Sequence, residues 1–233
     1  MLNRVLEPEV MNTSDEALDY NQMDHSHVNR VFVDDFVTAL EPLKDLSSTL
    51  LHVFDAGTGT ALIPIELISR GRPFKITASD LADEMLIVAK QNVLARGYQS
   101  SIELVLRDCK KLPEAGGFYD AIMSNSIVHH IPEPARVIGE LWRVLKPGGL
   151  YFVRDLMRPG DLGTLERIVE TYAGDANAHQ QQMFRESLHA ALTLDEVHDI
   201  LTSLGIPSTA VQATSDRHWT ISFRKYCASR ITR

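Results

Sequence analysis

Residues 50–61 read LLHVFDAGTGTA, and they carry the strongest signal for the fold in this sequence. Its first half is an apolar run typical of a buried strand, and its second half contains a turn formed by Gly57 and Gly59. Glycine lets the backbone bend sharply and approach a ligand closely, because it carries no Cβ. The Ile- and Leu-rich segment that follows predicts a helix whose first N–H groups face the turn. The stretch is typical of a nucleotide-like cofactor site, although a bare Gly-x-Gly turn is equally typical of a tight connection without a ligand.

An acidic residue follows at the distance that a cofactor site requires. Residues 74–79 (FKITAS) predict a second strand that ends at Asp80, 21 residues after Gly59. A carboxylate at this position can accept hydrogen bonds from both hydroxyls of a ribose. Two more strands are predicted at 101–106 and 119–123, and the motifs HHIP (129–132) and LKPGGLYFV (145–153) come after them.

These five segments, in this order, resemble the class I S-adenosylmethionine-dependent methyltransferases, of the small-molecule type similar to the quinone-biosynthesis methyltransferases. The resemblance covers residues 50–155. It implies an α/β fold with a Rossmann-like, doubly wound sheet of about seven strands whose last strand is antiparallel. It also implies N-terminal helices, a helical insertion after the fifth strand, and S-adenosyl-L-methionine as the cofactor.

The resemblance assigns cofactor-binding roles to residues at the ends of the strands. The expected sets are Asp55, Gly57, Thr58 and Gly59 at the methionine end, Asp80 at the ribose, Leu81 and Met85 beside the adenine, Asp108 and Cys109 at the adenine edge, and Asn125 and Ser126 beneath the sulfonium. The family often has Ser where this chain has Ala82, so Asp83 is the expected substitute cap of the helix over 83–96.

Methyl transfer is an in-line displacement, so an enzyme of this kind acts mainly by holding the acceptor and the methyl group in a near-attack geometry. A general base is added where the acceptor carries a proton at neutral pH. His129 and His130, in the loop after the fourth strand, are the candidate bases. A structural role is the alternative, with one imidazole bonded to a backbone carbonyl. Asp155 at the end of the fifth strand either orients a polar substrate together with Arg154 or closes the strand end with an ion pair.

Composition limits the other classes of function. The 233 residues carry a formal net charge of −8, which argues against a nucleic-acid partner because such surfaces are normally basic. The two cysteines are far apart, and no Asp, Glu and His residues have metal-ligand spacing, so we expect no metal and no arsenic chemistry. The first eight residues have no apolar core of a leader, and no stretch reaches the roughly 18 apolar residues of a membrane span. A small-molecule substrate, no membrane partner, a cytoplasmic location and a monomer or homodimer are therefore expected.

The order of elements predicts a single methyltransferase domain over 1–233. Residues 1–48 are expected to form a helical cap, with a short helix at 14–20 capped by Ser14, a longer one from Ser26 to about Leu43, and lid candidates at Tyr20 and His25. Residues 50–155 are the cofactor-binding core. Residues 156–192 interrupt the alternation of strands and helices and are the expected substrate lid, with two helices and polar residues for an acceptor. Residues 193–233 hold the last large helix and a β-hairpin.

Two other functions fit parts of the sequence. A nicotinamide-dependent oxidoreductase also uses Gly-x-Gly and a distant carboxylate, but its third glycine is Leu62 in this chain. A non-catalytic scaffold or sensor that binds S-adenosylmethionine fits every motif, because methyl transfer requires few side chains. Methylation of nucleic-acid exocyclic amines is disfavoured, because Ser124-Asn125-Ser126-Ile127 stands where an Asp/Asn-Pro-Pro-aromatic segment is expected.

Overall fold

The computed structural model describes residues 2–8, 12–41 and 49–226. By its contacts the chain divides into two compact units. Unit 1 consists of Met1–Glu9, Ser126–Ala135 and Arg154–Ile221, and unit 2 of Val10–Asn125, Arg136–Val153 and Ser222–Arg233. The predicted end of the second helix at Leu43 and the predicted boundary of the cap at residue 48 lie outside the described residues.

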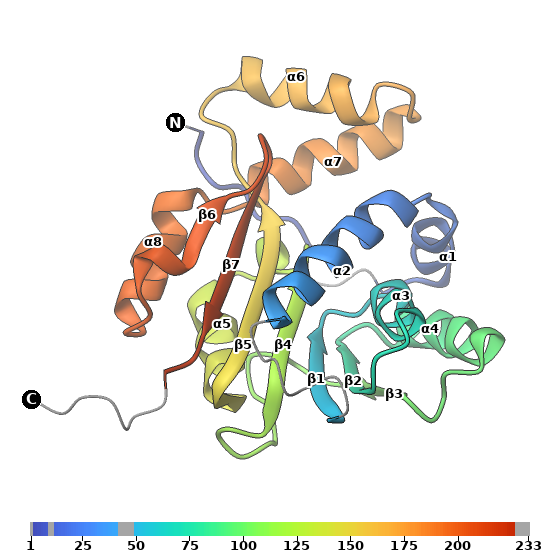
Figure 1. Cartoon of the computed structure of the whole chain (residues 1–233). Coiled ribbons are helices and arrows are strands. Elements are labelled where there is room, and N and C mark those ends of the chain that lie inside the picture. The colour runs from blue at the N-terminus through green and yellow to red at the C-terminus, as the bar shows by residue number, and fades with distance from the viewer. Residues whose placement is uncertain (1, 9–11, 42–48, 227–233) are drawn as a thin grey trace, which may run out of the picture. The chain divides into compact units, whose positions relative to one another are not determined.

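Strands and helices alternate along the chain, as the sequence predicts (Figure 1). The helices are α1 (Ser14–Gln22), α2 (Ser26–Leu40), α3 (Leu62–Ser69), α4 (Asp83–Arg96), α5 (Pro134–Val144), α6 (Leu162–Ala173), α7 (Ala178–Ala190) and α8 (Leu194–Ser203), with 3₁₀ turns η1 (Val128–His130) and η2 (Ser208–Ala210). The strands are β1 (Leu51–Ala56), β2 (Phe74–Asp80), β3 (Ile102–Leu106), β4 (Tyr119–Asn125), β5 (Leu145–Leu156), β6 (Val211–Ala213) and β7 (His218–Arg224).

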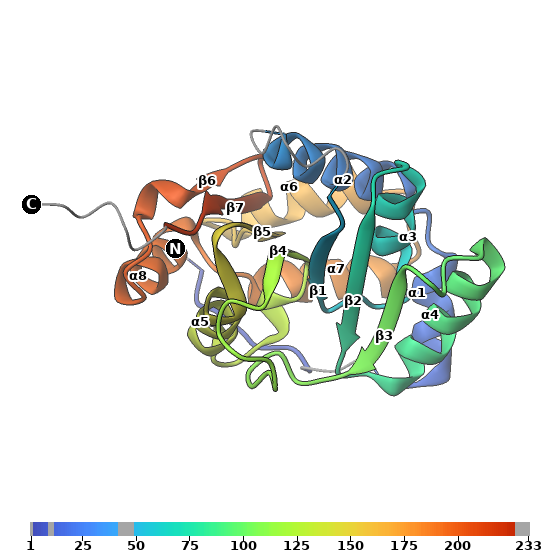
Figure 2. The same ribbon diagram turned by 60° about the horizontal axis from the view of Figure 1, so that its bottom comes forward.

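The sheet has seven strands in the order β3-β2-β1-β4-β5-β7-β6, which confirms the predicted α/β architecture. In unit 2, β1 pairs in parallel with β2 on one side and β4 on the other, so that Val53 lies opposite both Ile76 and Ala121 (Figure 2). β3 is parallel to β2, whereas β6 and β7 are antiparallel to each other. Because β1 to β4 run in the same direction, their carboxyl ends meet at one edge of the sheet, where ligands of such folds bind.

Helix α2 packs two aromatic side chains into the core of unit 2. The rings of Phe32 and Phe36 lie edge-on to Phe152 of β5, with centroid distances of 5.3 and 5.7 Å. The sequence predicts one buried face of this helix from apolar residues at helical spacing (Val28, Val31, Phe32, Phe36, Val37 and Leu40), but Val28 and Val31 are 42% and 40% exposed. The buried face of α2 therefore lies slightly to one side of the predicted one.

Two helix caps differ from the sequence prediction. Helix α1 is capped by Thr13, not Ser14, through a capping box in which Thr13 and Glu16 satisfy each other's backbone N–H groups. Asp83 is not the N-cap residue of α4, since Ala82 holds that position and makes no side-chain cap bond, but Asp83 Oδ1 accepts from the Glu84 N–H of the first turn at 3.1 Å. The predicted end of α4 at Gly97 is confirmed, since Gly97 adopts φ +73°.

Strand β5 begins earlier than predicted. The sequence predicts that Pro147-Gly148-Gly149 ends a helix, but α5 ends at Val144 and the strand starts at Leu145. A Cβ at Gly149 would lie 2.7 Å from the carbonyl oxygen of Asp120, so only glycine fits here. Asp120 also accepts a hydrogen bond from the backbone of His52 at 2.9 Å and pairs with Lys146 at 2.6 Å, which ties the starts of three strands together.

Unit 1 contains its own apolar core. Helices α6 and α7 lie side by side and bury Leu165, Ile168 and Leu188 against Leu156. The helical insertion predicted for 156–192 is therefore confirmed as an ordered pair of helices. The segment predicted as a strand from Ser208 begins with the 3₁₀ turn η2, and only Val211–Ala213 pairs with β7.

Within the described ranges, no helix combines the length and the apolar character that crossing a bilayer requires.

Candidate active site

The Gly-x-Gly turn of unit 2 requires backbone conformations that favour glycine. Gly57 and Gly59 have φ values of +70° and +54°. The turn is fixed by a hydrogen bond of 2.8 Å from the Thr58 N–H to the carbonyl of Ser79 on β2. Ala61, the N-cap residue of α3, also has a positive φ of 62°, which costs a non-glycine residue about 1–2 kcal/mol. The turn thus stores backbone strain next to the exposed N–H groups of a helix start, as ligand-binding turns often do.

Asp80 connects the end of β2 to this turn. Its Oδ2 atom accepts a hydrogen bond from the Gly59 N–H at 2.7 Å, and its Oδ1 atom accepts one from the Ala82 N–H at 2.9 Å. Burial raises the pKa of Asp80, while these N–H donors counteract the rise. Each carboxylate oxygen has a second lone pair, so the side chain still has acceptor capacity for a ligand.

Three polar atoms around the turn are buried without a hydrogen-bond partner in the described residues. They are Asp55 Oδ2, Thr58 Oγ1 and Thr60 Oγ1. Burial, reinforced by the Asp80 carboxylate, raises the pKa of Asp55 to about 7, and a contact with the Thr58 hydroxyl outside hydrogen-bond geometry partly opposes the rise. Because unpaired buried polar atoms are costly, a polar ligand that bonds to them would stabilise the turn. The residues therefore fit a cofactor with hydroxyl and amino groups.

Tyr20 of α1 lies over the turn. Its Cε1 atom is 3.5 Å from the position that a Cβ on Gly59 would occupy. The His25 ring lies against the Tyr20 ring at a centroid distance of 4.6 Å, and His25 Nε2 is 3.2 Å from the Tyr20 carbonyl. Asn92 joins the turn to the same segment, since its side-chain amide donates to the Thr60 carbonyl and to Asn21. The prediction that this segment is a lid accordingly gains a structural basis for Tyr20.

The two residues predicted to flank the adenine have different surroundings. Leu81 follows Asp80 directly and is 40% exposed. Met85 is buried among Ala17, Ala82 and Val88, between α1 and α4. Leu81 is thus available to a planar ligand, whereas Met85 serves packing in this structure.

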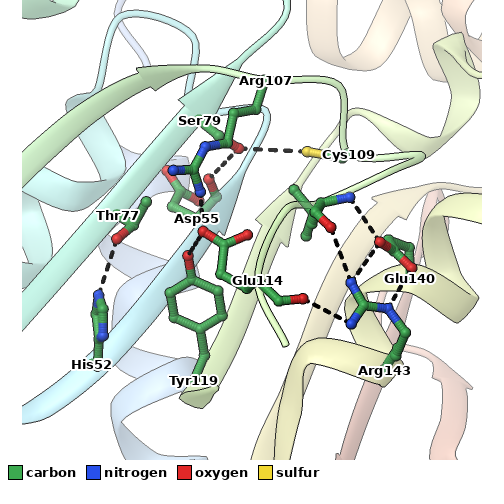
Figure 3. A network of polar contacts seen from close by, with 11 residues as sticks. His52, Asp55, Thr77, Ser79, Arg107, Cys109, Glu114, Tyr119, Glu140 and Arg143 are labelled. Atoms are coloured by element: carbon green, nitrogen blue, oxygen red, sulfur yellow. Dashed lines mark hydrogen bonds and ion pairs between the residues drawn. The ribbon is translucent and has the colours of Figure 1, made fainter. Parts of the chain in front are cut away.

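The loop after β3 contains Asp108 and Cys109, of which Cys109 is drawn in Figure 3. Asp108 accepts from the Lys110 backbone at 2.9 Å and pairs with its ammonium at 3.1 Å. The Cys109 thiol is 3.4 Å from the hydroxyl of Ser79, which bonds to the Asp55 carbonyl at 3.2 Å. Burial raises the pKa of Cys109 to about 12, so the side chain is a neutral thiol and does not act as a nucleophile.

Figure 3 also shows what fixes the rest of this loop. The Glu114 carboxylate bonds to Arg107 and to the hydroxyl of Tyr119. Arg143 of α5 donates to the backbone carbonyls of Leu112 and Glu114 at 3.1 and 2.8 Å. No local sequence pattern predicts this network, because its members are spread over separate elements. It positions Asp108 and Cys109 indirectly.

Asn125 and Ser126 stand where β4 ends. Asn125 is the last residue of the strand, and the preceding Ser124 donates to the Ala56 carbonyl at 2.9 Å. Ser126, the first residue of its segment of unit 1, has φ +59° and donates its N–H to the Arg154 carbonyl at 2.9 Å. Strain at a non-glycine residue at the end of a strand is a frequent mark of a functional turn.

Asp155 and His129 form a buried pair in unit 1. His129 Nδ1 is 2.5 Å from Asp155 Oδ1, and the carboxylate also accepts from the N–H groups of Val128 and Leu156 at 2.5 and 2.6 Å. Burial alone would raise the pKa of Asp155, but His129 and these N–H groups lower it. The predicted ion pair at the strand end is thus made with His129.

Glu7 extends this pair into a cluster, and sequence reasoning missed it. Its Oε1 atom is 3.4 Å from His129 Nε2 and 3.1 Å from His130 Nδ1. Arg4 anchors the segment, since its guanidinium donates to the carbonyls of His129, Ile131 and Ala190. No local pattern in residues 2–8 signals this role, because the contact joins two distant parts of the chain.

The histidines of the cluster have opposite pKa shifts. Burial favours the neutral form of both rings. For His129 the Asp155 and Glu7 carboxylates outweigh burial and raise the pKa. Burial and the neighbouring His129 lower the pKa of His130 to about 4, so that ring is neutral at pH 7.

The polar residues of the insertion are mostly engaged within unit 1. Arg185 pairs with Glu166 at 2.8 Å, and Arg158 pairs with Glu196 at 2.7 Å. Gln180 completes the capping box of α7 with Asn177. Arg185, Arg158 and Gln180 stabilise the insertion, so they are less available to a substrate than the sequence suggested.

Residues 54–153 match the family described as "Methyltransferase domain". These residues are similar to a methyltransferase domain. A ubiquinone/menaquinone biosynthesis C-methyltransferase of Geotalea daltonii is 29% identical over 46% of this chain and 46% of its own length. A demethylmenaquinone methyltransferase of Desulfitobacterium hafniense is 32% identical over 47% of this chain and 44% of its own length. The chain thus spans about half the length of the curated relatives it matches.

The fold agrees with solved structures. A SAM-dependent methyltransferase from Aquifex aeolicus superposes with a TM-score of 0.58, covering 90% of this chain and 97% of the other, at 18% identity. At that identity the likeness shows the fold alone. The family match and the relatives agree with the resemblance to class I methyltransferases similar to those of quinone biosynthesis.

Proposed function

We propose that this protein transfers a methyl group from S-adenosylmethionine to a small-molecule acceptor. The observation that carries the proposal is the hydrogen bond between the Asp80 carboxylate and the Gly59 N–H, beside three buried polar atoms without partners. When bound, S-adenosylmethionine supplies a methyl group on a sulfonium. The domain match and the named relatives support this choice of cofactor.

Residues of unit 2 would hold the cofactor. Asp80 is placed to accept the ribose hydroxyls, as the resemblance implies. Asp55 and Thr58 offer the unpaired oxygens to the polar methionine end. Tyr20 lies against the turn. Asn125, Asp108 and Cys109 are proposed for the roles that the resemblance implies.

The cluster of His129, His130 and Asp155 is proposed to act on the acceptor. Asp155 fixes the orientation of the His129 ring, and a fixed imidazole can raise the nucleophilicity of an acceptor atom. The insertion at 156–192 is proposed to cover the acceptor. Protection of its amides from hydrogen exchange on adding an acceptor tests that part of the proposal.

Transfer of a labelled methyl group tests the function. The purified protein is incubated with methyl-labelled S-adenosylmethionine and a metabolite extract, with the Asp80→Ala variant as the control. Label in a small molecule with the wild type, and much less with the variant, supports the proposal. Binding of S-adenosylmethionine without transfer to any extract would instead favour the scaffold or sensor.

Some finer expectations accompany the proposal. Relatives named for quinone biosynthesis and for a sterol favour an apolar acceptor with a ring system. A cytoplasmic location and the absence of a nucleic-acid partner are inferred from the sequence alone. These two expectations and a monomeric or homodimeric state stay predictions.

A further inference from the structure

Three donor atoms of unit 1 come together within the span of a metal-ligand set. They are Glu7 Oε1, His129 Nε2 and His130 Nδ1, and all lie within 4.8 Å of one another. Glu7 Oε1 is 3.4 Å from the first nitrogen and 3.1 Å from the second. Ligands that bind zinc at about 2.0–2.2 Å are about 3–3.5 Å apart in tetrahedral and octahedral geometries. The two distances from Glu7 fall within that spacing.

Two of these donors are buried and unsatisfied. Neither Glu7 Oε1 nor His130 Nδ1 has a hydrogen-bond partner in the part of the chain that the structure describes. They approach each other to 3.1 Å, yet no hydrogen bond forms between them. Two such atoms in a buried site are costly unless a third group satisfies both. A cation between them would do so.

His129 is held by its other ring nitrogen. His129 Nδ1 lies 2.5 Å from the Asp155 carboxylate, and Nε2 lies 3.4 Å from Glu7 Oε1. A carboxylate in this position fixes the tautomer and orientation of a metal-binding histidine.

The charges near the donor atoms favour a cation. Glu7 and Asp155 supply two carboxylates beside the ring nitrogens of His129 and His130. Arg4 is the opposing charge, and its guanidinium is bound to three backbone carbonyls. Two carboxylates against one guanidinium suit a divalent ion better than an anion.

We propose that Glu7, His129 and His130 bind a divalent first-row transition cation such as Zn²⁺, with Asp155 as the positioning residue of His129. Two histidines and one glutamate are the ligands of several catalytic zinc sites, which keep a further position open. A cation there would lower the pKa of a bound hydroxyl or water and so replace a histidine base. The sequence predicts no metal, because Glu7 lies far from the histidines along the chain.

The inference depends on the geometry of unit 1 and not on the proposed methyl transfer. It is tested with the full chain, freed of any affinity tag and treated with chelator, then titrated with Co²⁺ and followed by visible absorption. Calorimetry with Zn²⁺ gives the stoichiometry. We expect one ion per chain and the absorption bands of low-coordinate Co²⁺ with nitrogen ligands.

Matched variants identify the ligands. Glu7→Gln and His130→Ala should each weaken Zn²⁺ binding at least about tenfold, and Asp155→Asn should weaken it about 10–100-fold, as loss of an outer-shell partner does. His179→Ala, on the exposed surface of α7 in the same unit, should leave binding unchanged. Glu7→Gln keeps the shape of the side chain, so its far-ultraviolet circular dichroism should match the wild type.

Two results would overturn the inference: no Co²⁺ or Zn²⁺ bound at stoichiometric concentration, or Glu7→Gln and His130→Ala binding as tightly as the wild type. Binding of S-adenosylmethionine is measured in the same preparations. If S-adenosylmethionine binds and no metal does, only the cation site is rejected. If metal binds and S-adenosylmethionine does not, only the proposed cofactor is rejected.

Discussion

The Oδ2 atom of Asp80 accepts a hydrogen bond of 2.7 Å from the backbone N–H of Gly59. The bond joins the end of β2 to the turn after β1, so the carboxylate that the sequence assigns to a ribose also stabilises the glycine turn. Function and local stability are therefore coupled at this residue, and variants of Asp80 have to be tested for both.

Replacing Asp80 should weaken the cofactor and the fold together. Asp80→Ala removes two hydrogen bonds to a charged acceptor, each worth ~1.5–3 kcal/mol, so calorimetry should show at least a tenfold loss of affinity for S-adenosylmethionine. It also leaves the N–H groups of Gly59 and Ala82 unpaired, which should lower the free energy of unfolding by ~1–3 kcal/mol. The exposed Asp83→Ala is the matched control. Unchanged affinity in Asp80→Ala would show that the ribose is bound elsewhere.

A pair of glycine variants separates backbone strain from ligand contact. Gly59 and Gly97 have φ values of +54° and +73°, so Ala at either position should cost ~1–2 kcal/mol in the free energy of unfolding. Only Gly59→Ala places a methyl group in the ligand turn, 3.5 Å from the Tyr20 ring, whereas the surroundings of Gly97 are open. Denaturant unfolding should show similar losses, and calorimetry should show weaker cofactor binding for Gly59→Ala alone. Equal affinities in the two variants would move the cofactor away from this turn.

The buried carboxyl of Asp55 predicts a dependence of stability on pH. Its folded pKa of about 7 lies above the usual 3.8, so the folded state binds the proton more tightly. The cost of ionising the buried group therefore grows as pH rises from about 4 to 7. Relative to the wild type, Asp55→Asn should gain about 2–3 kcal/mol more stability at pH 8 than at pH 5, because each pKa unit corresponds to ~1.4 kcal/mol. Denaturant unfolding at both pH values measures this difference. A gain that does not change with pH would mean that Asp55 is ionised throughout.

Removing His129 should affect the reaction more than the cofactor. If the cluster activates the acceptor, His129→Ala should lower turnover by ~10²–10⁴ and leave the affinity for S-adenosylmethionine nearly unchanged. Single-turnover assays and calorimetry of the same variant measure the two quantities, with His198→Ala on α8, outside the proposed substrate lid, as the control. Parallel losses of rate and affinity would indicate that the His129–Asp155 pair has a structural role.

Much of the fold was predictable because its signals are local. The apolar run before Gly57 and the helix end at Gly97 depend on residues close in sequence, and both are confirmed. The predicted start of β5 was wrong, because a sequence such as Pro147-Gly148-Gly149 usually ends a helix. Here the tight packing of Gly149 against Asp120 keeps the segment in the sheet. Tertiary packing thus overrode the local turn signal.

Local sequence signals also predicted some residues of the candidate sites and missed others. Asp80 follows a strand at a fixed distance from Gly59, so its position at the turn could be predicted. The association of Glu7 with His130 could not, because no periodicity relates residues so far apart. The N-cap of α4 also differs from the prediction, because Ala82 occupies that position and Asp83, one residue later, accepts from the Glu84 N–H within the first turn.

The most direct test of the central claim is calorimetry of the purified protein with S-adenosylmethionine, its demethylated product and NAD. We expect S-adenosylmethionine and the product each to bind at one site per chain, and we expect NAD to give no saturable heat. Tight binding of NAD with no response to S-adenosylmethionine would contradict it.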